Sequence, residues 1–210
     1  MTFSLFPKTI YKTTSKISGL IEVNELLWSR TLSVQNMIQS GGLIEAIWKK
    51  PIRKIKNQKS KIKDVLILGL GGGTVVHLIN RYWPQALITG IELDPEIIKV
   101  GKEYFGLGKM DQLKIIVSDA FSYLEQHHGE KEYDLIVVDL YLGKKFPQEA
   151  AGEKFMKTIK RLLVKNGVVI FNRLRIDPQE EFIKNLNKVY RDYKVVRSMT
   201  NHFFLARSNF

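Results

Sequence analysis

The chain has 210 residues and carries 33 lysines and arginines against 21 aspartates and glutamates, which gives a net charge of +12 at neutral pH. It contains no cysteine, so disulfide bonds and thiolate metal sites are excluded, and its four histidines do not have the spacing of metal ligands. With 44% hydrophobic residues and no apolar run of membrane-spanning length, the chain is typical of a soluble protein with one sizeable core.

The first 48 residues predict a small N-terminal β lobe. Residues 19–23 and 30–37 are rich in β-branched side chains with partial alternation, which favours a hairpin or a small sheet. Residues 41–48 could add one or two helical turns. The N-terminus has neither the apolar core nor the cleavage site of a signal peptide, so we expect a cytoplasmic protein that does not bind membranes.

A strongly basic stretch follows this lobe. Residues 49–63 hold eight basic side chains and no acidic one. Such a run could bind nucleic acid or another anionic surface through Lys49–Lys63. No aromatic residues alternate with the basic ones to stack on bases, so we interpret the stretch as a solvated linker and keep nucleic-acid binding as an alternative.

The most informative segment comes next, at residues 65–94. Val65–Leu68 is a short apolar run that predicts a buried strand, residues 74–83 have helical spacing, and residues 87–91 predict a second strand. Glu92 follows 19 residues after the last glycine of the turn, about the spacing at which a Rossmann-type unit places an acid on a ribose. The turn itself lacks side chains where a ligand would approach, at Gly69, Gly71, Gly72 and Gly73.

The alternation of helices and strands continues to the end of the chain, with Asp94 as the expected N-cap of the next helix and a turn at residues 165–167. Residues 64–210 therefore predict one α/β domain with a doubly wound, mostly parallel, Rossmann-like sheet. The further predicted helices are 94–105, 121–126, 153–164 and 178–190, and the further predicted strands are 113–117, 134–138, 168–171, 193–197 and 203–206.

A polar feature follows each predicted parallel strand. Ligands of open α/β sheets bind at the carboxyl ends of the strands, so these features should lie together. After the glycine turn they are Glu92, Asp119, Asp139 and Asn172.

The spacing of the glycines indicates the class of ligand. Gly69, Gly71 and Gly73 fit GxGxG, whereas Thr74 occupies the third glycine position of GxGxxG. This spacing points away from a pyrophosphate dinucleotide and toward a nucleoside cofactor without phosphates, such as S-adenosylmethionine. Glu92 could accept hydrogen bonds from both ribose hydroxyls of that nucleoside.

These residues resemble the spermidine synthase family, the polyamine aminopropyltransferases, which have the class I S-adenosylmethionine-dependent methyltransferase fold. The similarity covers about residues 18–175. The family's strand–GGGDGG motif aligns with Leu68–Gly73, with Leu68 at the end of the strand. Its V-E-I-D aligns with 91–94 and its G-D-[AG] with 118–120. Its aspartate-led motif starts at Asp139, and its N-terminal pattern is echoed by Arg30, Leu32 and Gln39.

The resemblance implies a transferase that uses S-adenosylmethionine or its decarboxylated form and moves an aminopropyl or methyl group to an amine-type acceptor. It also implies a homodimer formed through the N-terminal lobe. In this scheme the ribose is held by Glu92, the adenine end by Asp119 and Ala120, the attacking amine by Asp139 with Tyr141 beside it, and the substrate by Gln39.

Three departures from the family pattern bear on the acceptor. Gly72 replaces the aspartate of the glycine turn. The run Asp139–Gly143 lacks the second aspartate of D-x-x-D-P and is followed by Lys144 and Lys145. The family's acidic residues just after the glutamine are also absent, since Gln39 is followed by Ser40–Leu43. Lysines repel a polycation, so putrescine is disfavoured as the acceptor. A methyltransferase that acts on a small molecule or on RNA, and a non-catalytic relative, remain as alternatives.

Overall fold

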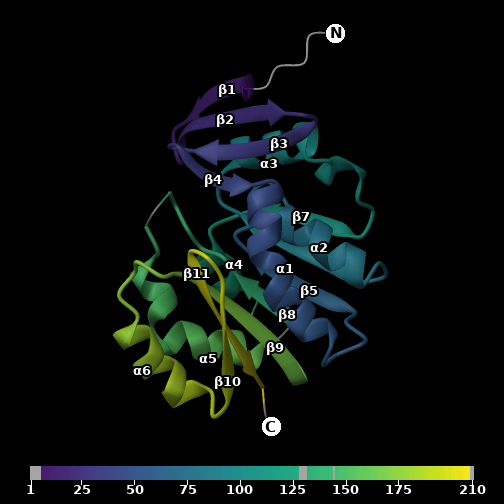
Figure 1. Ribbon diagram of the computed structural model, residues 1–210. Coiled ribbons are helices and arrows are strands. Elements are labelled where there is room, and N and C mark those ends of the chain that lie inside the picture. The colour runs from purple at the N-terminus through teal and green to yellow at the C-terminus, as the bar shows by residue number, and fades with distance from the viewer. Residues whose placement is uncertain (1–5, 128–131, 144, 209–210) are drawn as a thin grey trace.

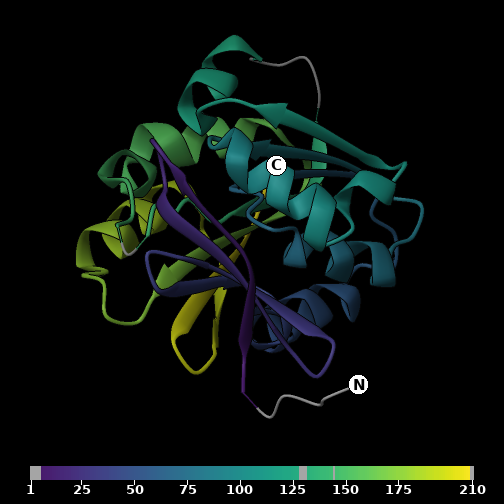
Figure 2. The same ribbon diagram turned by 90° about the horizontal axis from the view of Figure 1, so that it is seen from above.

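The computed structural model describes residues 6–127, 132–143 and 145–208, and its strands form two sheets (Figure 1). The smaller sheet is antiparallel, in the order β1-β2-β3-β4. It lies above the larger sheet in Figure 1 and in front of it in the view from above (Figure 2). Its strands are β1 (Lys8–Ser15), β2 (Gly19–Leu26), β3 (Ser29–Val34) and β4 (Met37–Ser40).

The N-terminal sheet confirms the predicted β region, for which a small sheet was one of the two alternatives. Strand β1 was not predicted, and it pairs with β2 over its whole length. Ile21 and Val23 of β2 and Leu32 of β3 are fully buried, and they pack on Ile97 and Val100 of the helix α3 (Pro95–Tyr104). A sheet with one buried face therefore joins the N-terminal region to the main fold.

The larger sheet confirms the doubly wound, mostly parallel prediction. Its order is β10-β11-β9-β8-β5-β6-β7, and the five strands from β9 to β7 run parallel, while β11 and β10 are antiparallel additions. The central strands β5 and β8 are buried over most of their length, as expected for strands covered on both faces. The bounds are β5 (Asp64–Leu68), β6 (Leu87–Glu92), β7 (Leu113–Val117), β8 (Tyr133–Val138), β9 (Leu163–Leu174), β10 (Tyr193–Arg197) and β11 (Asn201–Arg207).

Two separate apolar cores cover the two faces of this sheet. One contains side chains of α4, α5 and α6, and the other contains side chains of α1 and α2. None of the helices in the described ranges is long and apolar enough to cross a bilayer. The remaining helices are α1 (Gly42–Lys56), α2 (Thr74–Tyr82), α4 (Ala120–Gln126), α5 (Glu153–Arg161) and α6 (Glu180–Val189), with short 3-10 turns η1 (Leu107–Lys109) and η2 (Gln148–Ala151).

The basic stretch 49–63 is not a linker over its first half, because α1 continues through it to Lys56. Ile52 and Ile55 are buried against the core beside α2. Lys49 and Arg53 are exposed on the same helix. The apolar residues of the stretch thus form one helix face and the basic residues the other, which explains why charge alone suggested a solvated segment.

The turn predicted at residues 165–167 is an irregularity within β9. Asn166 has a φ of +59°, and the pairing with β8 advances five residues on β9, from Leu163 to Val168, against two on β8. Extra residues in one strand form a bulge and bend that strand. β9 therefore starts earlier than predicted, and the preceding helix α5 ends at Arg161.

The docking of α1 predicts a sharp difference between its two faces. Ile52→Ala removes a side chain with no exposed surface, so we expect a loss of about 2–5 kcal/mol in unfolding free energy measured by urea denaturation. Lys49→Ala, on the exposed face of the same helix, should change that free energy by about 0.5 kcal/mol or less. Equal, small effects of both substitutions would contradict the docked helix.

Candidate active site

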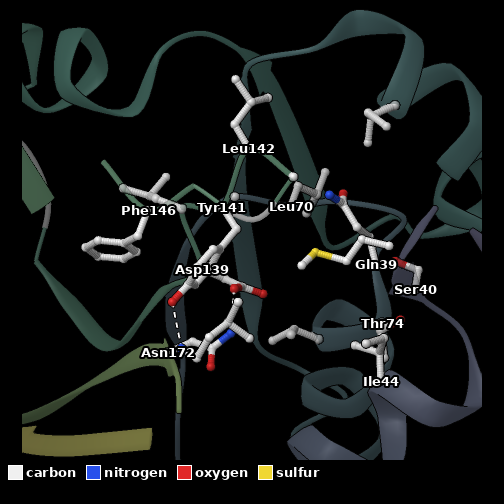
Figure 3. A pocket seen from close by; sticks show the side chains of 18 of the residues that line it. Gln39, Ser40, Ile44, Leu70, Thr74, Asp139, Tyr141, Leu142, Phe146 and Asn172 are labelled. Carbon is white, nitrogen blue, oxygen red and sulfur yellow. Dashed lines mark hydrogen bonds between the residues drawn. The ribbon is translucent and has the colours of Figure 1, made fainter. Parts of the chain in front are cut away.

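A cavity of about 1210 Å³ opens at the carboxyl ends of the parallel strands. Its walls come from the glycine turn, the ends of β6, β8 and β9, the start of α1 and the strand β4 of the N-terminal sheet (Figure 3). A ligand site is expected at this edge of an open α/β sheet. The N-terminal sheet closes one side of it.

The three glycines predicted to hold a cofactor have different roles. Gly69 and Gly73 have φ values of +87° and +90°, and a Cβ there would lie 2.1 Å from the carbonyl oxygen of Asp139 and 2.2 Å from Leu107. Gly71 has a φ of +55°, and a Cβ there would make only ordinary contacts, 3.7 Å from Ser40 Oγ and 4.0 Å from the Gln39 carbonyl oxygen. Gly69 and Gly71 line the cavity and Gly73 does not. Gly71 is therefore the position at which a ligand can approach the backbone.

Glu92 lies at the end of β6 with its carboxylate held by backbone N–H groups. Gly71 N donates to one oxygen at 2.8 Å, and Leu93 N and Asp94 N donate to the other at 2.9 and 3.1 Å. Burial raises the pKa of Glu92, and the three N–H donors oppose that rise. A carboxylate has about four acceptor positions, so it can still accept from a ligand hydroxyl.

Asp119 caps α4 and also lines the cavity. Its Oδ1 accepts from Phe121 N and Ser122 N, both at 3.0 Å. These two bonds use one oxygen, so Oδ2 remains as an acceptor at the cavity wall beside Ala120. Leu93 and Phe121 also line the cavity, and sequence reasoning missed both because single apolar residues carry no motif.

Asp139 ends β8 and is oriented by a chain of side-chain hydrogen bonds. Asn172 Nδ2 donates to Asp139 Oδ1 at 2.7 Å, Asn201 Nδ2 donates to Asn172 Oδ1 at 2.8 Å, and Thr200 Oγ1 donates to Asn201 Oδ1 at 2.5 Å. The direction of each bond fixes the next amide, so an N–H group of Asn172 faces Asp139. Asn201 and Thr200 were not predicted, because β11 is distant from β8 in sequence.

The pKa of Asp139 is raised to about 6. Burial is the main cause, and the negative charge of Glu92 adds to it, while the hydrogen bond from Asn172 acts in the opposite direction. A carboxyl group with this pKa is ionised at neutral pH and can also hold a proton at slightly lower pH. That range suits a group that accepts a proton during a reaction.

Tyr141 lines the cavity, but its hydroxyl forms hydrogen bonds with other residues of the protein. The hydroxyl donates to Asp177 Oδ2 at 2.5 Å and accepts from Leu174 N at 2.7 Å. Burial and the bond to Asp177 raise its pKa. The ring, which lies 5.3 Å from the ring of Phe146, is the part of Tyr141 that remains for a ligand. Its predicted catalytic role stays a prediction.

β4 supplies the opposite wall of the cavity, where Gln39 lies across from Asp139 (Figure 3). Next to it, Ser40 Oγ accepts from Gly72 N at 2.9 Å. A Cβ on Gly72 would lie 2.7 Å from that oxygen, so Ser40 occupies the space of a larger residue at position 72. Lys145 lines the cavity, and Lys144 lies outside the described residues.

Comparison with known proteins places this site in a family. Residues 45–204, more than half of the chain, match the model of the spermine/spermidine synthase domain. The chain belongs to this family. The family's fold is also found here: a probable spermidine synthase from Corynebacterium glutamicum superposes with a TM-score of 0.79 over 98% of this chain and 81% of its own, at 17% identity. The predicted resemblance is therefore confirmed.

The similar proteins include both aminopropyltransferases and methyltransferases by name. Polyamine aminopropyltransferase of Vibrio vulnificus is 29% identical over 152 residues, 70% of this chain and 50% of its own length. The eEF1A lysine and N-terminal methyltransferase homolog of Drosophila melanogaster is 31% identical over 137 residues, 61% of this chain and 20% of its own. Human methyltransferase-like protein 13, solved with SAH, has a TM-score of 0.64 at 22% identity over 77% of this chain and 80% of that one. The chain thus spans a fifth to a half of these curated relatives.

The position of Glu92 predicts its importance for nucleoside binding. Glu92→Ala should weaken the binding of S-adenosylmethionine at least ten-fold, about 1.4 kcal/mol, because a charged hydrogen-bond acceptor is lost. Calorimetry measures this, and Glu96→Ala, a partly exposed acid on α3, is the matched control that should bind as the wild type does. A folded Glu92→Ala variant with unchanged affinity would remove the ribose assignment.

Proposed function

We propose that this protein transfers an alkyl group from the sulfonium of an S-adenosyl cofactor to the nitrogen of an amine acceptor. The observation that carries the proposal is the oriented carboxylate of Asp139 in the same cavity as Glu92 and Asp119. The carboxylates of the cavity fit an adenosine, since Glu92 and Oδ2 of Asp119 can still accept hydrogen bonds from its hydroxyl and amino groups. Gly71, which has no side chain and lines the cavity, lets the part of the cofactor beyond the ribose approach the backbone.

The residues of the chain contribute orientation and a proton acceptor. The cofactor supplies a carbon bonded to positively charged sulfur, and the C–S electron pair leaves with the sulfur as the new C–N bond forms. Asp139 accepts a hydrogen bond from the attacking amine, and then the proton that the nitrogen loses. Asn172 holds one oxygen of Asp139 in place, which leaves the other for the amine.

We favour methyl transfer from S-adenosylmethionine over aminopropyl transfer. Among the described residues that line the cavity, Asp139 is the one carboxylate besides the two assigned to the nucleoside, and Lys145 and Arg175 are cations. A polyamine acceptor needs several carboxylates. The methyltransferase names of the Drosophila and human relatives agree with this choice.

Aminopropyl transfer is the second candidate, and membership of the spermine/spermidine synthase domain family favours it. Calorimetric titration with S-adenosylmethionine and with its decarboxylated form separates the two. We expect at least ten-fold tighter binding of S-adenosylmethionine. Tighter binding of the decarboxylated form would reverse the choice, and binding of neither would contradict the proposed function as a whole.

Nucleic-acid binding through Lys49–Lys63 stays a prediction, and the comparisons bring no support for it or for a homodimer. Three of the basic side chains in this stretch interact with other residues of the protein. Lys50 donates to the Arg197 carbonyl, Lys56 lies 5.6 Å from the centre of the Trp83 ring, and Lys59 forms a 2.8 Å ion pair with Asp134.

The pKa of Asp139 predicts a pH dependence. The base must be ionised, so kcat for a primary amine should fall as the pH drops below about 6. Asn172→Ala removes the hydrogen bond that stabilises the carboxylate, which raises the pKa of Asp139 further and moves this fall to higher pH. Asn185→Ala, which removes a side-chain bond to the Ala151 carbonyl, is the control. Identical pH profiles for all three proteins would exclude Asp139 as the proton acceptor.

A further inference from the structure

Apolar side chains surround the mouth of the cavity and extend beyond it. Ile176 and Met199 are 81% and 74% exposed, and four more large apolar residues of the cavity lining are at least 40% exposed. We call this set the apolar rim, and it comes from six separate segments: Ile38, Leu43, Leu93, Leu142, Ile176 and Met199. Single exposed apolar residues are ordinary, but a group around one opening indicates a contact surface.

The two most exposed members of the apolar rim are held on a fixed support. Arg175 N donates to the Thr200 carbonyl at 2.8 Å, and Arg175 Nη1 donates to the Met199 carbonyl at 3.1 Å. These bonds join the segment after β9 to the turn between β10 and β11. Ile176 and Met199 are thus presented by ordered backbone next to Asn172, whose side chain orients Asp139.

The charges at the mouth differ from those at its floor. Glu92, Asp119 and Asp139 lie at the strand ends, whereas Lys145 and Arg175 are exposed and line the cavity wall. The chain as a whole has a net charge of +12 at neutral pH. An approaching partner therefore meets positive charge and apolar surface before its amine reaches Asp139.

We propose that the acceptor amine is carried by a polypeptide segment that lies across the apolar rim, with apolar and acidic residues beside the amine. A small amine enclosed in the cavity would leave Ile176 and Met199 in water, whereas a chain longer than the cavity would cover them. Acidic residues of that segment would pair with Lys145 and Arg175. This inference rests on the proposed amine transfer.

The test uses the full chain, S-adenosylmethionine and defined acceptors. The first acceptor is a peptide of about a dozen residues in which leucines and aspartates surround one lysine. The second has lysines in place of its aspartates and serines in place of its leucines, and n-butylamine and putrescine complete the set. Mass spectrometry measures alkylation. We expect kcat/KM for the first peptide at least ten-fold above that of every other acceptor.

Variants of the apolar rim separate docking from chemistry. Ile176→Ser combined with Met199→Ser should lower kcat/KM for the first peptide at least ten-fold and leave n-butylamine alkylation and cofactor affinity unchanged. Lys145→Glu should also lower kcat/KM for the first peptide, because it replaces the positive charge that would pair with the aspartates of the peptide. Leu87→Ser replaces an apolar residue of similar exposure, 56%, at the opposite end of the sheet and should change nothing.

Each other result overturns a defined part of the account. Equal use of the small amines and the peptides, or peptide alkylation that the rim variants do not change, would overturn the polypeptide acceptor and leave amine transfer intact. Binding of the cofactor without alkylation of any acceptor, or no binding of the cofactor, would overturn the proposed function and this inference together.

Discussion

The backbone of the glycine turn passes so close to the end of β8 that a Cβ on Gly69 would lie 2.1 Å from the carbonyl oxygen of Asp139. A second contact of the same turn, from Gly71 N to the carboxylate of Glu92, joins it to the end of β6. The approach therefore brings Glu92 and Asp139 to one cavity floor. A side chain at Gly69 would push the turn away from the end of β8 and widen the site.

The same close approach places two buried carboxylates near each other, and local hydrogen bonds stabilise their charges. Burial disfavours ionised carboxylates, and it raises the pKa of both Glu92 and Asp139, whose charges also repel. Hydrogen bonds from backbone N–H groups stabilise the ionised carboxylate of Glu92, and a hydrogen bond from the side-chain amide of Asn172 stabilises that of Asp139. A cationic sulfonium placed between the two carboxylates would reduce their repulsion, so this floor favours a positively charged cofactor although the whole chain is basic.

Much of this fold could be predicted because its parallel strands are short apolar runs that end in polar or glycine residues. Glu92, Asp119 and Asp139 were predicted as neighbours since the carboxyl ends of parallel strands share one edge of a sheet. Asp94 was recognised as a helix cap, and its side chain accepts from Glu96 N at 2.9 Å.

The predictions that failed concern features with weak local signals. The apolar face of α1 was hidden within a run of lysines that includes Pro51, a residue that disfavours helix interiors. The chain of bonds from Thr200 through Asn201 and Asn172 joins β11 to Asp139 at the end of β8. These strands are distant in the sequence, and no spacing rule connects them. The engagement of the Tyr141 hydroxyl by Asp177 also depends on tertiary structure, so sequence alone could not separate its ring from its hydroxyl.

In the proposed function, one cavity floor binds the nucleoside and presents Asp139 to the reacting carbon. A crystal structure with bound S-adenosylhomocysteine tests this most directly. We predict that the ribose hydroxyls lie within hydrogen-bond distance of Glu92 and that the sulfur faces the carboxylate of Asp139. A nucleoside bound away from Glu92, or a sulfur directed away from Asp139, would contradict the account.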